Sequence, residues 1–67
     1  MALNLQTFIE RNPDTAPIFA EARRARRIRS AVRKQQVYFR LKGRLYEKTP
    51  IHEHDTGTRL LTEEMGI

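Results

Sequence analysis

Residues 21–36 read E-A-R-R-A-R-R-I-R-S-A-V-R-K-Q-Q and form the densest run of charge in this chain of 67 residues. Residues 22–46 carry ten basic side chains and no acidic one, although the net charge of the whole chain is only +5. The segments on either side are acidic on balance, so a basic centre lies between acidic ends. This distribution indicates a negatively charged partner, either nucleic acid or another acidic surface.

The same run predicts a long amphipathic helix that begins near Asp14 and Thr15, with Pro17 in its first turn. Apolar residues recur along it at helical spacing and form a narrow seam that we expect to be buried, made of Ile18, Ala22, Ala25, Ile28 and Val32. Five pairs of arginines lie three or four residues apart, at 23/26, 24/27, 26/29, 23/27 and 29/33. Each such pair destabilises a helix by roughly 0.2–0.5 kcal/mol. We interpret this repulsion as a sign that a polyanion completes the site.

Residues 37–50, V-Y-F-R-L-K-G-R-L-Y-E-K-T-P, are rich in β-branched and aromatic residues and are interrupted by Lys42 and Gly43. This pattern predicts a β-hairpin. Its core-facing side would carry Val37, Phe39, Leu41 and Leu45. Its outer side, both basic and aromatic, would carry Tyr38, Arg40, Tyr46 and Lys48. An alternative continues the basic helix through Leu41 to a cap at Gly43, but that helix would place Arg29 and Gln36 in the buried seam, so we favour the hairpin.

A short N-terminal helix is expected from about residue 4 to residue 11, because Leu5, Phe8 and Ile9 share one helical face. Asn4 can cap its start, and the pair of residues 12–13, Asn-Pro, ends it. Such a short helix is not stable alone and must pack against the rest of the chain.

Near the C-terminus, Gly57 predicts a turn, and residues 59–65 predict a short helix with Leu61 and Met65 on its inner face. The fold expected from the sequence is therefore α+β. It comprises a short N-terminal helix, a long arginine-rich helix, a β-hairpin and a short C-terminal helix in one small domain, residues 1–67.

The function expected from the charge is that of a small, basic nucleic-acid-binding accessory protein, with RNA slightly preferred over DNA. Guanidinium groups match phosphate oxygens in a two-point contact, and exposed aromatic rings can stack on unpaired bases. The residues expected to contact nucleic acid are Arg23, Arg24, Arg26, Arg27, Arg29, Arg33, Lys34, Arg40, Lys42, Arg44, Tyr38 and Tyr46. The segment A-R-R-A-R-R-I-R, residues 22–29, resembles the arginine-rich helices that viral and ribosomal proteins place in RNA grooves, and this resemblance favours RNA.

The alternative function is that of a non-enzymatic interaction or assembly subunit that docks its basic helix on an acidic protein surface. A small inhibitor, or a virion-associated or ribosome-associated component of a larger assembly, would fit this description. In either case we expect the acidic ends, including Asp55, Glu63 and Glu64, to lie over the arginines and weaken indiscriminate binding.

Several other classes of function lack the residues they need. The chain has no cysteine, no glycine-rich phosphate loop and no nucleophile elbow, so we expect no enzyme, no cofactor and no small-molecule substrate. His52 and His54 are two residues apart, which is not the spacing of a helical zinc pair, and we expect no metal site. No apolar run approaches the ~20 residues of a membrane span, and the first residues lack a secretion signal. The expectation is a soluble, cytoplasmic protein without a membrane partner.

Overall fold

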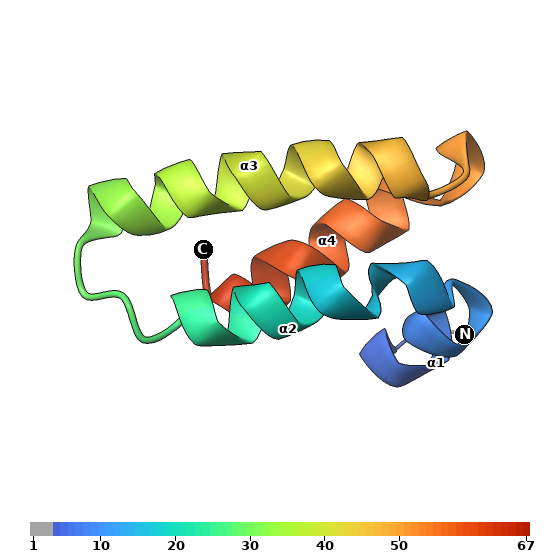
Figure 1. Cartoon of the computed structure of the whole chain (residues 1–67), viewed down its shortest axis with the longest axis horizontal. Helices are drawn as coiled ribbons and strands as arrows, with labels where there is room; N and C mark the ends of the chain where they lie inside the picture. The colour runs from blue at the N-terminus through green and yellow to red at the C-terminus, as the bar shows by residue number, and fades with distance from the viewer. Residues whose placement is uncertain (1–3) are drawn as a thin grey trace.

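Helices account for most of residues 4–67, the range that this computed structural model describes, the side chain of His52 excepted. The elements in chain order are α1 (Leu5–Arg11), η1 (Pro13–Thr15), α2 (Ala16–Ala25), α3 (Ala31–Lys48), η2 (Ile51–Glu53) and α4 (His54–Met65), where η marks a single 3-10 turn. Figure 1 shows α3 lying along one side of the molecule and α2 along the other, with α4 packed against both. The short α1 lies at the end of the bundle where α2 begins (Figure 1).

The predicted β-hairpin is wrong, because residues 37–48 belong to α3 and the described part of the chain contains no strand. Their local β preference is overridden by packing, as such preferences often are. Leu41 and Leu45 lie one turn apart and are buried, while Val37 and Tyr38 pack at the margin of the same core. No helix in the described range is both long enough and apolar enough to cross a bilayer.

The arginine-rich run is divided between two helices, whereas the sequence predicts one. α2 ends at Ala25, and residues 26–30 are not α-helical. Ser30 then starts α3 as its N-cap, with an extended backbone (φ −71°, ψ 123°) and a side-chain oxygen that accepts the Arg33 backbone N–H at 3.3 Å. Each of the five arginine pairs that lie three or four residues apart has a member in residues 26–30, which are not α-helical. The repulsion predicted between neighbouring turns of one long helix therefore does not arise.

The core forms where α2, α3 and α4 meet and is closed at one end by Phe8 of α1. The seam predicted from the sequence is confirmed at Ile18, Ala22 and Ala25, which are buried. It is wrong at Val32, whose side chain is 68% exposed because α3 starts in a new helical phase after the break. The largest fully buried apolar side chains are Phe8, Phe19, Ile18, Leu41, Leu45, Leu61 and Met65. The rings of Phe8 and Phe19 meet edge to face, with centroids 5.9 Å apart.

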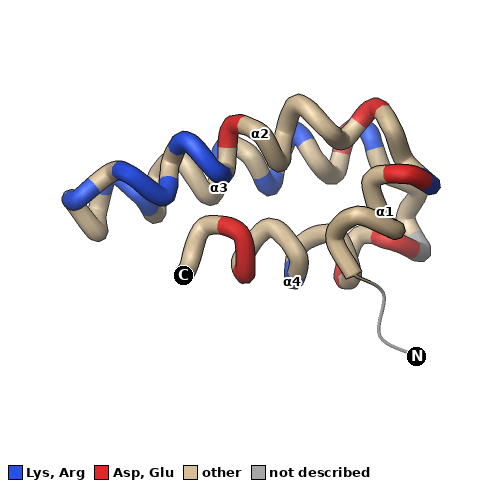
Figure 2. Tube along the Cα trace, turned by 90° about the horizontal axis from the view of Figure 1, so that it is seen from below, with Lys and Arg blue, Asp and Glu red and all other residues tan. Residues whose placement is uncertain are grey.

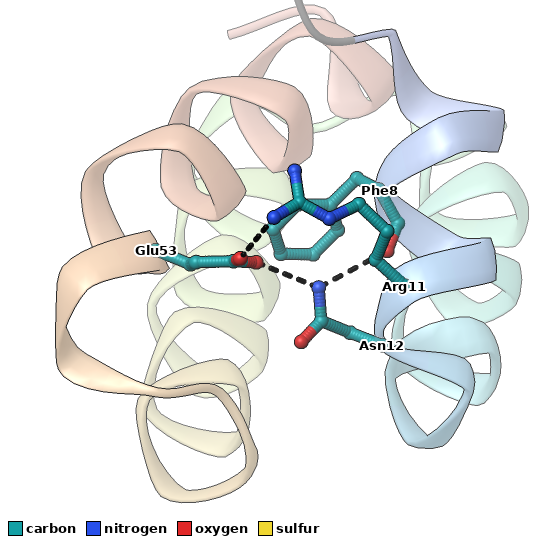
Figure 3. A network of polar contacts seen from close by, with 4 residues as sticks. All are labelled: Phe8, Arg11, Asn12 and Glu53. Carbon is teal, nitrogen blue, oxygen red and sulfur yellow. Dashed lines mark hydrogen bonds and ion pairs between the residues drawn. The ribbon is translucent and has the colours of Figure 1, made fainter.

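The N-terminal helix is confirmed, with Asn4 as its cap: the Asn4 Oδ1 accepts the Thr7 backbone N–H at 2.8 Å. Polar contacts then tie the end of α1 to the start of α4 (Figure 3). The Asn12 Nδ2 donates to the Phe8 carbonyl oxygen at 3.1 Å and to Glu53 Oε2 at 2.7 Å, while Arg11 Nη2 lies 3.4 Å from Glu53 Oε1. These contacts hold α1 against the bundle.

The C-terminal helix is confirmed in kind but begins earlier than predicted, at His54, and it includes Gly57. The predicted turn at Gly57 is therefore wrong. A Cβ atom at this position would lie 3.0 Å from Leu45 Cδ2 and 3.0 Å from Phe8 Cζ. Glycine thus allows the close approach of α4 to α3 and α1, and it does not form a turn. At the other end, Gly66 ends α4 in the left-handed conformation (φ 75°).

Candidate nucleic-acid interface

Most of the basic residues lie on two helices and on the turn between them, and they are not spread around one helix. Figure 2 shows lysine and arginine gathered toward the end of the bundle where α2 leads into α3, with acidic residues on α4 and near α1. Two helices and the turn between them therefore supply most of the positive charge. Most of these basic residues lie in three environments: the side of the molecule facing α4, the turn between α2 and α3, and a groove between these two helices.

On the side facing α4, two arginines share one carboxylate. Arg23 Nε lies 3.2 Å from Glu64 Oε1, and Arg26 Nη1 lies 3.5 Å from the same atom. The Glu64 side chain is only 10% exposed, while both arginines remain more than half exposed. The expectation that acidic C-terminal residues lie over the arginines is confirmed for Glu64. Asp55 lies in the first turn of α4 and Glu63 is exposed.

The groove lies between the last turns of α2 and the middle of α3, has a volume of about 600 Å³ and is open to solvent. Its lining from the α2 side and the turn comprises Glu21, Arg24, Ala25 and Ile28. Its lining from α3 comprises Arg33, Val37, Arg40 and Arg44. Four guanidinium groups and one carboxylate thus surround a floor of small and branched apolar side chains.

The carboxylate in the groove is already engaged. Arg44 Nη1 donates to both carboxylate oxygens of Glu21 at 2.5 Å, and both side chains are about one-third exposed. The contact holds the Arg44 guanidinium at one end of the groove. Arg24, Arg33 and Arg40 form no ion pair with any carboxylate of the described chain. An anion in the groove could therefore contact three guanidinium groups that are not already paired with a carboxylate of the described chain.

All four groove arginines are among the residues predicted to contact nucleic acid, but they were not predicted to form a group, and Glu21, Ala25, Ile28 and Val37 were not predicted to lie at the site. The signal is present in the spacing. The α2 stripe, residues 21, 24, 25 and 28, and the α3 stripe, residues 33, 37, 40 and 44, each repeat every three to four positions and so lie on one face of a turn or helix. The two stripes belong to separate helical faces because Ser30 caps a new helix between them, and the sequence prediction of one long helix did not include this cap.

The turn between α2 and α3 carries two further exposed arginines. Arg27 and Arg29 lie in residues 26–30 with exposed side chains and no ion pair within the described residues. Lys34 is half-buried in the first turn of α3. Lys42 is placed differently from the groove residues, with its Nζ 5.8 Å from the centroid of the Tyr46 ring. The predicted basic residues therefore do not form a single continuous track.

The three aromatic residues of α3 lie in different surroundings. Tyr38 packs at the edge of the core, and its hydroxyl is 3.0 Å from Thr62 Oγ1, which ties α3 to α4. Tyr46 is 42% exposed, and its ring stacks on His54 with centroids 4.3 Å apart. Phe39, expected in the core, is instead 57% exposed. The exposed aromatic residues are thus Phe39 and Tyr46.

No group of three or more potential metal ligands occurs among the residues whose placement is described. The His54 Nε2 is 2.6 Å from the Thr49 carbonyl oxygen and joins the end of α3 to α4. The other histidine of the predicted pair, His52, has its side chain outside the described residues. His54 therefore has a structural contact of its own.

Comparison with known proteins adds no family to this description: no protein-family model, curated protein or solved structure matches the chain.

Proposed function

We propose that the chain is a small nucleic-acid-binding accessory protein that holds phosphates in the groove between α2 and α3. The observation that carries the proposal is the convergence of Arg24, Arg33, Arg40 and Arg44 from two helices on one open groove. Phosphate oxygens accept two parallel hydrogen bonds from a guanidinium group, and several such groups around one groove suit a chain of phosphates better than a single charge. As expected from the sequence, RNA is slightly preferred over DNA in this proposal, and the proposed location is the cytoplasm.

Binding of this kind positions a nucleic acid without reading its sequence. Contacts to phosphate carry no direct information on base identity. The groove lining contains no asparagine or glutamine, the residues that most often read adenine edges. We therefore expect affinity that depends strongly on salt and weakly on sequence.

The test is a titration of labelled RNA and DNA strands followed by fluorescence anisotropy at ~50 and ~200 mM salt. The groove variant is Arg33→Gln with Arg40→Gln, because glutamine keeps helix propensity and removes the charge. The matched control is Arg11→Gln with Arg59→Gln, which lowers the net charge equally but lies on α1 and α4.

The groove variant should bind more weakly than the control at both salt concentrations. Its slope of log K against log salt should also be shallower by about 1.4–1.8, since each lost phosphate contact removes about 0.7 for a single strand and about 0.9 for a duplex. Equal losses in the two variants would show that only net charge matters and would remove the groove from the proposal. If the wild-type protein bound neither RNA nor DNA at low salt, an acidic protein surface would replace nucleic acid as the expected partner.

A further inference from the structure

The outer face of α3 carries an uncharged stripe that the rest of the described structure leaves largely exposed. Val32, Phe39 and Tyr46 recur every seven residues, which places them on one side of the helix, and their side chains are 68%, 57% and 42% exposed. Gly43 lies between the two aromatic residues, and a Cβ atom there would meet nothing within 4 Å. The surface next to Phe39 is therefore open.

Phe39 is the ring of this stripe with the most accessible surface. Tyr46 is already stacked on His54 and approached by the Lys42 ammonium. The Phe39 ring has the Tyr38 ring on one side, with centroids 5.6 Å apart and planes tilted by 59°, and it is more than half exposed. A flat apolar ligand therefore has one clear position on this face, against Phe39.

Basic residues flank the stripe on both sides and favour an occupant that carries negative charge. Arg40 follows Phe39 in sequence and lies about 100° around the helix, on the groove side. Lys42 lies on the opposite flank, and α3 as a whole has six basic residues against one acidic residue, Glu47. A second copy of this chain would bring the same basic flanks and a further net charge of +5 to the contact. A ligand that is flat and apolar yet carries negative charge matches both features.

We infer that Phe39 stacks on an unpaired base of a single-stranded nucleic acid whose phosphates lie in the groove between α2 and α3. This inference rests on the proposed function and narrows its ligand to strands with exposed base faces. A duplex presents base edges in its grooves and keeps the faces stacked inside, whereas every unpaired base offers a face for an aromatic ring. Phe39 and the groove arginines lie on adjacent sides of α3, so one strand can reach both.

Three probes separate stacking from phosphate contact. They are a labelled single-stranded RNA of about 12 nucleotides, a length within the range that one small domain covers, the same strand annealed to its complement, and an abasic strand with the same number of phosphates. The test variant is Phe39→Leu, which keeps apolar bulk at an exposed helical position and removes the ring. The matched control is Val32→Ala on the same stripe. Circular dichroism checks that both variants keep the helical fold.

Phe39→Leu should weaken binding of the single strand by roughly 5- to 150-fold, the range measured when a stacking ring is removed. It should leave the duplex and the abasic strand bound as by the wild type, and Val32→Ala should change none of the three. A second variant, Phe39→Trp, retains a stacking ring and introduces the sole tryptophan of the chain. Its emission should be quenched by the single strand and not by the abasic strand.

The inference fails if Phe39→Leu binds all three probes as the wild type does, while the groove variant still loses affinity. It fails equally if all three probes are weakened together, because that result would place Phe39 in phosphate binding or in folding. A wild-type dimer that Phe39→Leu converts to a monomer, without a change in single-strand affinity, would assign the stripe to a second copy. Absence of binding by the wild type to every probe would instead refute the proposed function itself.

Discussion

Two glycines in the helices of this bundle should respond in opposite ways to the same substitution, Gly→Ala. Gly43 lies on the exposed face of α3, where an added Cβ would meet nothing within 4 Å. Gly57 lies in α4, where the Cβ would be 3.0 Å from both Leu45 Cδ2 and Phe8 Cζ. Both neighbours are fully buried, and the Phe8 ring is held edge to face against Phe19. An added Cβ would require each of them to shift by a few tenths of an ångström within a packed core.

The magnitude follows from two terms. Replacing glycine by alanine inside a helix stabilises it by about 1 kcal/mol, and this term is common to both variants. Overpacking in a filled core destabilises by about 1–3 kcal/mol, and this term applies to Gly57→Ala only. The two variants should therefore differ by about 1–3 kcal/mol in the free energy of unfolding. At ~4–8 °C per kcal/mol for a chain of this size, Gly43→Ala should melt roughly 4 to 24 °C above Gly57→Ala.

Thermal unfolding followed by far-UV circular dichroism measures this difference, and urea unfolding gives the free energies independently. Gly43→Ala should also melt above the wild type, as expected for an exposed helical glycine. If residues 37–48 formed a hairpin with Gly43 in its turn, this substitution would lower the melting temperature instead. Equal melting temperatures for the two variants would contradict the close approach of α4 to Phe8 and Leu45.

Three further predictions concern individual contacts. Ser30→Ala should destabilise the fold by about 0.5–1 kcal/mol in urea unfolding, the low end for a lost helix cap, because the capping bond is long at 3.3 Å. Asn12→Ala should lower the free energy of unfolding by about 1–3 kcal/mol, since it removes the hydrogen bond to Glu53 and the buried hydrogen bond to the Phe8 carbonyl oxygen. Arg11→Ala removes only an ion pair of an exposed arginine and should lower it by at most about 1 kcal/mol. Glu64→Gln frees two arginines, so it should tighten RNA binding in low-salt anisotropy titrations and steepen the salt slope, whereas Glu63→Gln should have a smaller effect.

The sequence was informative where a residue acts locally. Asn4 caps α1 and Pro17 lies in the first turn of α2, because both signals depend only on nearby backbone N–H groups. The buried positions Ile18, Ala22 and Ala25 followed from spacing alone. These predictions required no knowledge of what the segments pack against.

The sequence was misleading where tertiary contacts decide. The β preference of residues 37–39 predicted a strand, but Leu41 and Leu45 gain more by lying one turn apart on a helix that packs against α2 and α4. A glycine at position 57 is typical of a turn. Its role in the close packing of α4 is apparent only in the structure, where Leu45 and Phe8 lie beside it. Phe39 was predicted in the core because the hairpin would place it on the same face as Leu41, whereas in α3 it lies on the outer side of the helix.

The grouping of the arginines has a consequence for how a polyanion would be held. Two unit charges 4 Å apart interact by about 1 kcal/mol in water and by about 4 kcal/mol near a protein surface with an effective dielectric constant of 20. Arg27 and Arg29 on the exposed turn lie close to the first limit. Arg24, Arg33 and Arg40 are exposed as well, but they border one groove together with Arg44, so a phosphate held in the groove lies near several guanidinium groups at once. We therefore expect the turn to contribute mainly to the initial capture of a polyanion and the groove to contribute more to the lifetime of the complex. Replacing the two turn arginines by glutamine should then slow association while changing dissociation little, and the groove variant should do the reverse.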